Sequence, residues 1–242
     1  MKKLFSLLFT IMLIMSLLPS NSLASSSNEE GLKMTDEELE NMKEELIKYD
    51  VSNEIAENLA HKIKNGQPLD SMIMDIEDAI SFKVKKHSDD SEEYIYTFPD
   101  GSITVVGVEY APFYNNGGFT IQSTGISEGS CSSGSGYTSC TNRKIYYLNP
   151  GVWEMSFRAN YTYVSGGYDY ISWAGNESIW MVGGTVGNPY CRIIRSTETS
   201  SQKAEARFSA YLYLGGQYGT QTRSISLILG NDKAVAQGNT YY

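Results

Sequence analysis

The chain has 242 residues and a formal net charge of −9, so it lacks the positive charge that draws proteins to nucleic acids or anionic membranes, and neither is expected as a partner. Tyrosine is abundant, with 18 residues, whereas histidine occurs twice and cysteine three times. These few nitrogen and sulfur ligands are scattered along the chain and form no zinc motif, so we expect neither a metal nor a cofactor.

The N-terminus is typical of a bacterial secretory signal peptide. Lys2 and Lys3 precede the apolar run Leu4–Leu18, and Ser22-Leu23-Ala24 supplies a small-x-small cleavage site. The apolar run is short for a membrane span. We therefore expect residues 1–24 to be removed and the mature chain to be secreted into the extracellular medium, without stable membrane insertion.

Residues 25–82 are predicted to form an acidic helical hairpin. Thr35 and Glu38 make a capping box before one apolar stripe, and a second stripe stops at Gly66. A hairpin of this size is too small to be stable alone, so it should pack on the rest of the chain or on a partner. Residues 83–93 are dense in charge and are predicted to be a solvated linker.

Residues 94–242 are predicted to form an antiparallel β-sandwich, jelly-roll-like in architecture. Apolar and polar residues alternate strictly from Val152 to Tyr163 and again over Lys203–Leu214, which indicates half-buried strands. Further short strands are separated by turn signals, among them Ala174-Gly175-Asn176. Short strands at this regular spacing place the chain in the mainly β class, with the helical hairpin in front.

The three cysteines favour one disulfide. Cys131 and Cys140 flank a short Gly/Ser loop, and disulfides persist outside the cell, so they are the expected pair. Cys191 is then left over, although its pairing with either of the others stays open.

Two carboxylates give an enzymatic alternative. Secreted β-sandwich glycosidases use two facing carboxylates in an aromatic-lined cleft. Glu154 and Glu205 each lie on the polar face of a long predicted strand, and they would form such a pair if the strands were neighbours. The competing interpretation is a solvated sheet face, with Glu154 near Arg158 and Glu205 near Arg207 as ordinary surface charges.

The tyrosines favour a binding role instead. Amphipathic rings suit surfaces that hold sugars or proteins. We expect the outward-facing Tyr211 and Tyr213, together with Trp173 and Trp180, to be the ligand-binding residues. The favoured function is a noncatalytic binding or structural protein at the cell envelope or in the medium, with cell-wall or other polysaccharide, or a protein, as partner. The alternatives are the polysaccharide hydrolase and, less favoured, a pore-forming, toxin-like protein, whose strands alternate in a similar way.

One part of the chain resembles a known group of proteins. The segments LIKYDVSNEIAENLAHKIKNGQPLDSM and YIYTFPDGSITVV, followed later by GVWEMSFRANY, resemble uncharacterised secreted proteins of Gram-positive bacteria. In these proteins a helical hairpin ends in Gly, and an Asp-Ser pair and a Phe/Tyr-Pro-Asp-Gly-Ser turn follow. The matching residues are Gly66, Asp70, Ser71, Phe98, Pro99, Asp100, Gly101 and Ser102. Leu69 stands where the group usually has an aromatic residue. The resemblance implies export and a β-rich body, and it implies no activity, catalytic residue or cofactor.

Overall fold

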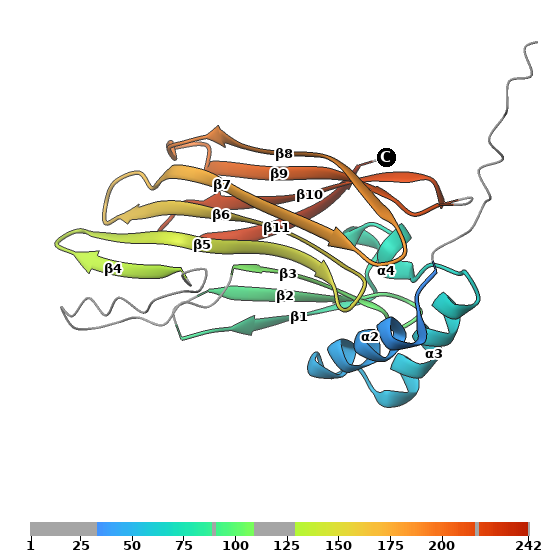
Figure 1. Ribbon diagram of the computed structural model, residues 1–242. Coiled ribbons are helices and arrows are strands. Elements are labelled where there is room, and N and C mark those ends of the chain that lie inside the picture. Colours follow the sequence, from blue (N-terminus) through green and yellow to red (C-terminus); the bar gives the residue numbers. More distant parts are fainter. Residues whose placement is uncertain (1–32, 89–90, 109–128, 216–217, 242) are drawn as a thin grey trace, which may run out of the picture.

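A computed structural model of the chain describes residues 33–88, 91–108, 129–215 and 218–241, so the predicted signal peptide lies outside the described residues. Short helices come first and strands make up the remainder (Figure 1). The helical elements are α2 (Asp36–Lys48), α3 (Asn53–Lys64), α4 (Asp70–Ile73) and η2 (Ile76–Asp78). The strands are β1 (Ser81–Lys86), β2 (Glu92–Thr97), β3 (Ile103–Val108), β4 (Ser130–Gly134), β5 (Tyr137–Asn149), β6 (Trp153–Val164), β7 (Tyr170–Met181), β8 (Thr185–Arg195), β9 (Ala204–Tyr213), β10 (Thr220–Leu229) and β11 (Ala234–Tyr241).

The strands form two antiparallel sheets. The larger has the order β1-β2-β3-β5-β6-β7, with β4 paired to β5, and the smaller has the order β11-β10-β9-β8. The predicted mainly β, antiparallel architecture with helices in front is confirmed. The connectivity differs from the jelly-roll-like prediction, because neighbours in the described sheets are almost always consecutive in sequence, which makes each sheet a meander.

The main core lies between the two sheets. The predicted alternation of the two long strands is confirmed, since one face of β6 is buried from Trp153 to Tyr161, with Tyr163 partly buried, and one face of β9 is buried. Tyr147 of β5 packs edge-to-face on Trp153 of β6, with 4.7 Å between the ring centroids. Arg223 reaches across from β10, and its Nη1 donates to the Tyr147 hydroxyl at 3.0 Å. Buried residues that point into this core include Tyr147, Trp153, Met155, Phe157, Ala159, Tyr161, Ala204, Ala206, Phe208, Ala210, Leu212, Arg223, Ile225 and Leu227.

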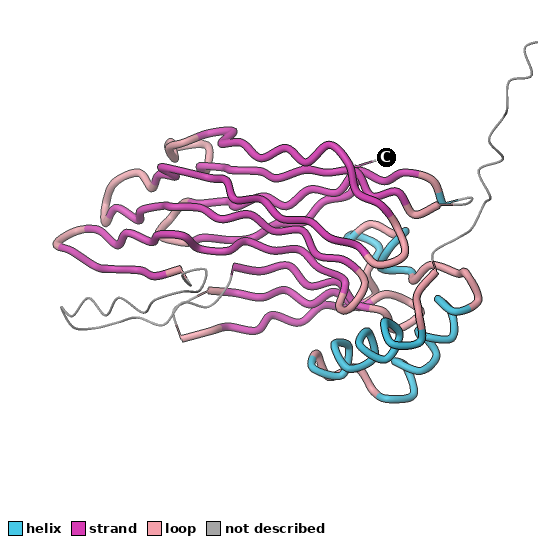
Figure 2. Tube along the Cα trace, in the orientation of Figure 1, coloured by secondary structure: helices cyan, strands magenta, loops and turns pink. Residues whose placement is uncertain are grey.

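The helices gather at one end of the sandwich, against the larger sheet (Figure 2). The capping box is confirmed: Thr35 Oγ1 accepts the Glu38 N–H, and the Glu38 carboxylate accepts the Thr35 N–H. Met42 of α2 and Leu59 of α3 are buried in the same apolar cluster as Val105 of β3. The helical hairpin therefore shares a core with the sheet. Helices this short are not stable alone, and this packing stabilises them.

Two local predictions are wrong. Residues 83–93 are no linker, because β1 pairs along its whole length with β2, in register from Ser81↔Thr97 to Lys86↔Glu92. The predicted turn at 174–176 lies inside the continuous strand β7, where Asn176 has a φ of 51° and the pairing with β6 shifts register. An extra residue at a β-bulge uses the same Gly and Asn chemistry as a turn, and only the pairing distinguishes the two.

The predicted disulfide is confirmed. Cys131 of β4 and Cys140 of β5 lie opposite each other in the ladder and are bonded. The part of the predicted Gly/Ser loop that the structure describes is thus a hairpin. Cys191 is a free, half-buried thiol, and burial together with the charge of Glu177 raises its pKa to about 11.

Candidate functional site

The structure does not bring Glu154 and Glu205 together. Glu154 lies in β6 of the larger sheet and Glu205 in β9 of the smaller one. The neighbours of each, such as Trp153 and Ala204, are buried between the sheets, so the two carboxylates point outward from opposite faces of the sandwich. The two-carboxylate catalytic pair is therefore wrong. Alternation showed which residues point outward, but it could not assign the two strands to different sheets.

Each of these carboxylates has a local partner. Glu154 Oε1 lies 2.6 Å from Lys144 Nζ. Glu205 Oε1 lies 2.5 Å from Arg207 Nη2 and accepts a hydrogen bond from Ser226 Oγ at 3.1 Å. These contacts agree with the alternative interpretation, in which both glutamates are charges on a solvated sheet face. The partner of Glu154 is Lys144, however, and not Arg158.

The predicted aromatic residues are also divided. Trp173 and Trp180 lie in β7, at the edge of the larger sheet, whereas Tyr211 and Tyr213 lie in β9 of the smaller sheet. They cannot contribute to one compact site. Tyr211 and Tyr213 are neighbours on one strand and share their face with a further exposed tyrosine, Tyr190 of β8.

Trp180 lines a pocket of about 290 Å³ between α2 and the end of the larger sheet. Glu154 and Tyr49 line the same pocket. Burial, and then the negative charges of Glu93, Glu45 and Glu154, raise the pKa of the Tyr49 hydroxyl to about 12. The phenol therefore stays protonated at neutral pH and presents a neutral hydroxyl to the pocket.

Three exposed tyrosines gather on the outer face of the smaller sheet. Tyr211 and Tyr213 are adjacent outward residues of β9, with 6.5 Å between their ring centroids. Tyr190 projects from the neighbouring strand β8, where it pairs with Ser209. Their exposed fractions are 57% for Tyr190, 36% for Tyr211 and 39% for Tyr213. We call these three residues the tyrosine face.

Small and hydroxyl-bearing residues surround the tyrosine face. Gly187 of β8 lies directly under the Tyr213 ring, because a Cβ added there would be 2.9 Å from Tyr213 Cε2. The Arg192 guanidinium lies over the Tyr190 ring at 5.5 Å. The cross-strand neighbours of the three rings are Thr185, Ser209, Thr220 and Thr222. The prediction missed Tyr190, because the irregular pairing after Gly187 hides the face on which it lies.

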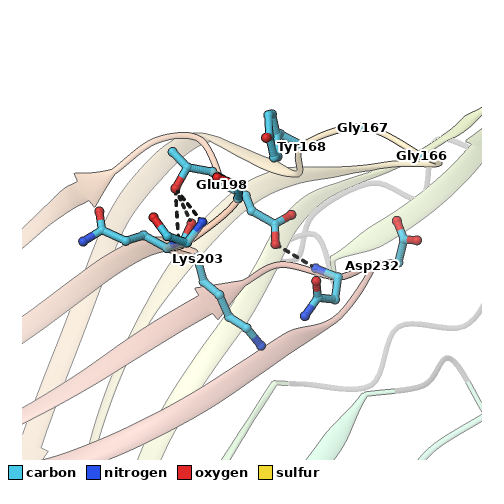
Figure 3. A pocket seen from close by; sticks show the side chains of 11 residues that line it. Gly166, Gly167, Tyr168, Glu198, Lys203 and Asp232 are labelled. Atoms are coloured by element: carbon cyan, nitrogen blue, oxygen red, sulfur yellow. Dashed lines mark hydrogen bonds between the residues drawn. The ribbon is translucent and has the colours of Figure 1, made fainter.

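A larger pocket of about 570 Å³ (Figure 3) lies at the end of the sandwich opposite the helices (Figure 1). It is formed by the β6–β7 turn, the β8–β9 loop and the β10–β11 turn. Tyr168, Glu198, Lys203 and Asp232 line it. Thr199 Oγ1 accepts the Gln202 N–H at 3.0 Å and closes the β8–β9 loop on itself.

Two buried carboxylates hold these loops together. Asp169 accepts the backbone N–H groups of Val164 and Asp232, each at 2.9 Å. Glu198 accepts those of Asp169 at 3.3 Å and Asn231 at 3.1 Å. Burial raises the pKa of Asp169, and the nearby charges of Asp232 and Glu198 add to the rise, although the two backbone hydrogen bonds oppose it. We call Asp169 and Glu198 the loop cluster. All four of their oxygens are used by the backbone, so the arrangement is structural.

The residues that carry the resemblance meet at the helical end. Lys62 Nζ lies 2.7 Å from Asp70 Oδ1 and 2.8 Å from Asp100 Oδ2. Asp70 and Asp100 also exchange backbone-to-carboxylate hydrogen bonds, at 2.9 and 3.1 Å. Ser102 Oγ accepts the Ser71 N–H at 3.0 Å. We call these five residues the junction cluster; it ties the helices to the β2–β3 turn, which explains the Asp-Ser and Asp-Gly-Ser elements as two halves of one contact.

The described part of the chain contains no metal-binding constellation. Among those residues, no group of three or more His, Cys, Asp or Glu is arranged to hold a metal ion. No described helix is long and apolar enough to cross a membrane. The tyrosine face is therefore the candidate site that the geometry supports best.

Comparisons with known proteins assign no family. No family model and no curated protein matches the chain. Among solved structures, the chain is similar to a hypothetical protein from Listeria monocytogenes EGD-e, with 16% identity and a TM-score of 0.29, over 64% of this chain and 96% of that one. We base no argument on a similarity with so low a TM-score.

Proposed function

We propose that the chain is an exported, noncatalytic binding protein that holds an extracellular polysaccharide on the tyrosine face. Export is supported by the signal-like N-terminus and is compatible with the Cys131–Cys140 disulfide. The observation that carries the binding role is the set of exposed rings at Tyr190, Tyr211 and Tyr213 on one sheet face. Rigid amphipathic rings interspersed with small polar residues supply contact area at low entropic cost, as in antibody binding sites.

A sugar chain suits this surface. The rings offer apolar area to the C–H faces of a sugar, and their hydroxyls, with those of Thr185, Ser209 and Thr222, offer hydrogen-bond donors and acceptors to its OH groups. Arg192 is the charged residue beside the rings. The carboxylate of Glu205, further along β9, is paired with Arg207.

Binding of the purified mature protein to isolated cell walls and a panel of insoluble polysaccharides tests the proposal. Wild type is compared with Tyr211→Ala/Tyr213→Ala and with the control Tyr168→Ala, which removes an exposed ring at the far loop end. Truncation of a ring at the centre of a binding surface costs about 1 kcal/mol or more of binding free energy, so the loss of both rings should weaken retention by about tenfold or more. The control should bind like wild type.

Two outcomes would overturn the proposal. Equal retention of all three proteins would place binding elsewhere, and failure of wild type to bind any polysaccharide would exclude this ligand class. In the second case a protein ligand for the tyrosine face would be the next candidate, because tyrosine is also enriched at protein interfaces.

A further inference from the structure

The outer face of the smaller sheet carries arginines next to the tyrosine face. Strand register puts Arg192 of β8 directly opposite Arg207 of β9. Both side chains point outward, since Arg192 is two residues after Tyr190 in β8 and the neighbours of Arg207 in β9 are buried. Arg195 follows on β8 and pairs with the outward Glu205 of β9. We call Arg192, Arg195 and Arg207 the arginine row.

Positive charge is in excess in the arginine row. Among the described outward positions of the smaller sheet, Glu205 is the single acidic residue. Its Oε1 lies 2.5 Å from Arg207 Nη2, so it compensates one guanidinium group. Arg195 donates Nη1 to the Lys203 backbone oxygen at 2.7 Å, and the described part of the chain gives neither Arg195 nor Arg192 a carboxylate as ion-pair partner. Two of the three positive charges are thus not balanced by a carboxylate.

Other carboxylates around this face have different surroundings. Glu198 is buried in the loop cluster, and Asp232 lines the loop-end pocket together with Lys203. Glu177 belongs to β7 of the larger sheet, and its charge acts on Cys191, an inward residue of β8 that pairs with the buried strand face of β9. None of these three carboxylates belongs to the outer face of the described strands, where arginines outnumber the carboxylate three to one.

The Arg192–Arg207 pair is unfavourable on its own. Like charges directly opposite each other in an antiparallel pair destabilise a sheet, and a sequence breaks such local rules mostly at functional sites. Every cationic residue within β8, β9, β10 and β11 is an arginine, although the chain has more lysines than arginines. The planar guanidinium group matches the paired oxygens of a carboxylate or a phosphate. An acid group bound between Arg192 and Arg207 would remove their repulsion.

The arginine row and the tyrosine face form one continuous surface. On β8, the Arg192 guanidinium lies over the Tyr190 ring, 5.5 Å from its centroid. On β9, Tyr213 and Arg207 are outward residues six positions apart, which is about 20 Å in a strand. An extended ligand that covers the rings therefore also reaches the guanidinium groups.

We propose that the ligand of the tyrosine face is an acidic polysaccharide, whose carboxylate or phosphate groups bind the arginine row while its sugar rings lie on the tyrosines. This inference rests on the proposed polysaccharide binding and adds that the sugar chain is anionic. The net charge of −9 repels a polyanion only weakly at a distance, because the Debye length is about 8 Å at physiological ionic strength. The guanidinium groups act at contact, where screening is least.

Fluorescently labelled oligosaccharides test the charge of the ligand. Oligogalacturonate carries a carboxylate on each sugar unit, and its methyl ester is the same chain without the charge. Fluorescence anisotropy with the full mature protein should show binding of the oligogalacturonate that is tighter than binding of the ester by about tenfold or more. A phosphorylated dextran oligomer, measured beside unmodified dextran, distinguishes the two acid groups, since the acidic chain that binds more tightly identifies the group that the arginine row prefers.

Variants locate the binding. Arg192→Gln/Arg195→Gln should weaken binding of the acidic chain by about tenfold or more and leave binding of the neutral ester unchanged. Tyr211→Ala/Tyr213→Ala should weaken binding of both chains. Arg158→Gln is the matched control and should bind like wild type, because Arg158 is a strand arginine of the larger sheet whose Nη1 also donates to a backbone oxygen. All variants should keep the far-UV circular dichroism of wild type.

The results that would overturn the proposal differ in what they leave standing. Equal binding of the acidic chain and its ester, or equal binding of the acidic chain by wild type and Arg192→Gln/Arg195→Gln, would reject an anionic ligand but leave polysaccharide binding intact. Polyglutamate that binds as tightly as oligogalacturonate would show that charge is recognised without sugar rings. If neither acidic nor neutral sugar chains bound, polysaccharide binding itself would be rejected.

Discussion

The two ends of the sandwich are both fastened by buried carboxylates, but with different chemistry. In the junction cluster at the helical end, Asp70 and Asp100 share the ammonium group of Lys62. In the loop cluster at the other end, the carboxylates of Asp169 and Glu198 accept hydrogen bonds from backbone N–H groups. The carboxylates at one end are therefore in direct contact with an ammonium group, and those at the other end are in direct contact with backbone N–H dipoles.

The pKa values of the two ends shift in opposite directions. At Asp100, burial raises the pKa, but hydrogen bonds from Lys62, Ser102 and the Asp70 backbone outweigh it, and the pKa falls below its ordinary 3.8. At Asp169, burial prevails over two backbone hydrogen bonds, and the pKa rises above 3.8. Similar loop-tying geometry thus stabilises the ionised form at one end and the protonated form at the other.

Removal of the Asp100 carboxylate should have the largest effect. In Asp100→Ala, Lys62 loses one partner and the N–H groups of Asp70 and Ser102 lose their acceptor. Breaking a partly buried, charged network should lower the free energy of unfolding by about 3 kcal/mol. The measurement is urea denaturation at pH 7, followed by tryptophan fluorescence.

The matched variant is Asp169→Ala at the loop end. Asp169→Ala should lower the free energy of unfolding by less, about 1–2 kcal/mol. The reason is that the variant also removes a buried carboxylate whose charge no ammonium group of the described residues contacts directly, so part of the lost hydrogen bonding is offset. If both variants lost the same stability, or if Asp169→Ala lost more, the cation of the junction cluster would not be the feature that distinguishes the two ends.

Replacement of Lys62 by methionine should convert the junction cluster into a cation-free cluster. Asp70 and Asp100 would then be two neighbouring carboxylates without an ammonium group, and the pKa of Asp100 should rise. We expect Lys62→Met to lose about 2 kcal/mol at pH 7. Part of this loss should be recovered near pH 5, as a carboxyl protonates. The control is Lys64→Met, on the same helix, whose ion pair with Asp36 is exposed. A loss in Lys62→Met that is the same at both pH values would contradict the electrostatic explanation.

Local sequence signals predicted the junction end better than the loop end. The cap at Thr35, the helix stop before Gly66 and the Pro99-Asp100-Gly101 turn are short-range features, and short-range chemistry fixes them. The loop cluster joins Asp169 to Glu198 and to the backbone at Asp232, three positions in separate turns. No local pattern marks them, and only the pairing of the strands brings them together.

The same reasoning applies to the candidate sites. Alternation correctly placed Tyr211 and Tyr213 on an outward face, since side-chain direction is set within one strand. It failed for Glu154 and Glu205, because strand order is a long-range property. The strand β1 was missed because the charge of Lys83, Lys85 and Lys86 indicated a solvated linker, although Phe82 and Val84 alternate with lysines. Lysines are common on edge strands, where they oppose pairing with another chain.

The smallest expected effect is a difference in pH dependence between the two ends. Asp169 has a raised pKa, so above pH 3.8 the folded state binds more protons there than the unfolded state, and the contribution of Asp169 to stability falls as pH rises through its folded pKa. Asp100 has a lowered pKa, so its contribution is complete above pH 3.8 and is lost only as pH falls through its folded pKa.

Urea denaturation of wild type, Asp169→Asn and Asp100→Asn from pH 3 to pH 7 separates the two contributions. The gap in stability between wild type and Asp169→Asn should narrow as pH rises from about 4 to 7. The gap between wild type and Asp100→Asn should widen between about pH 3 and pH 4 and then stay constant. If both stability differences changed with pH in the same way, the two carboxylates would titrate alike. In that case the backbone N–H groups would stabilise the charge of Asp169 as effectively as Lys62 stabilises the charge of Asp100.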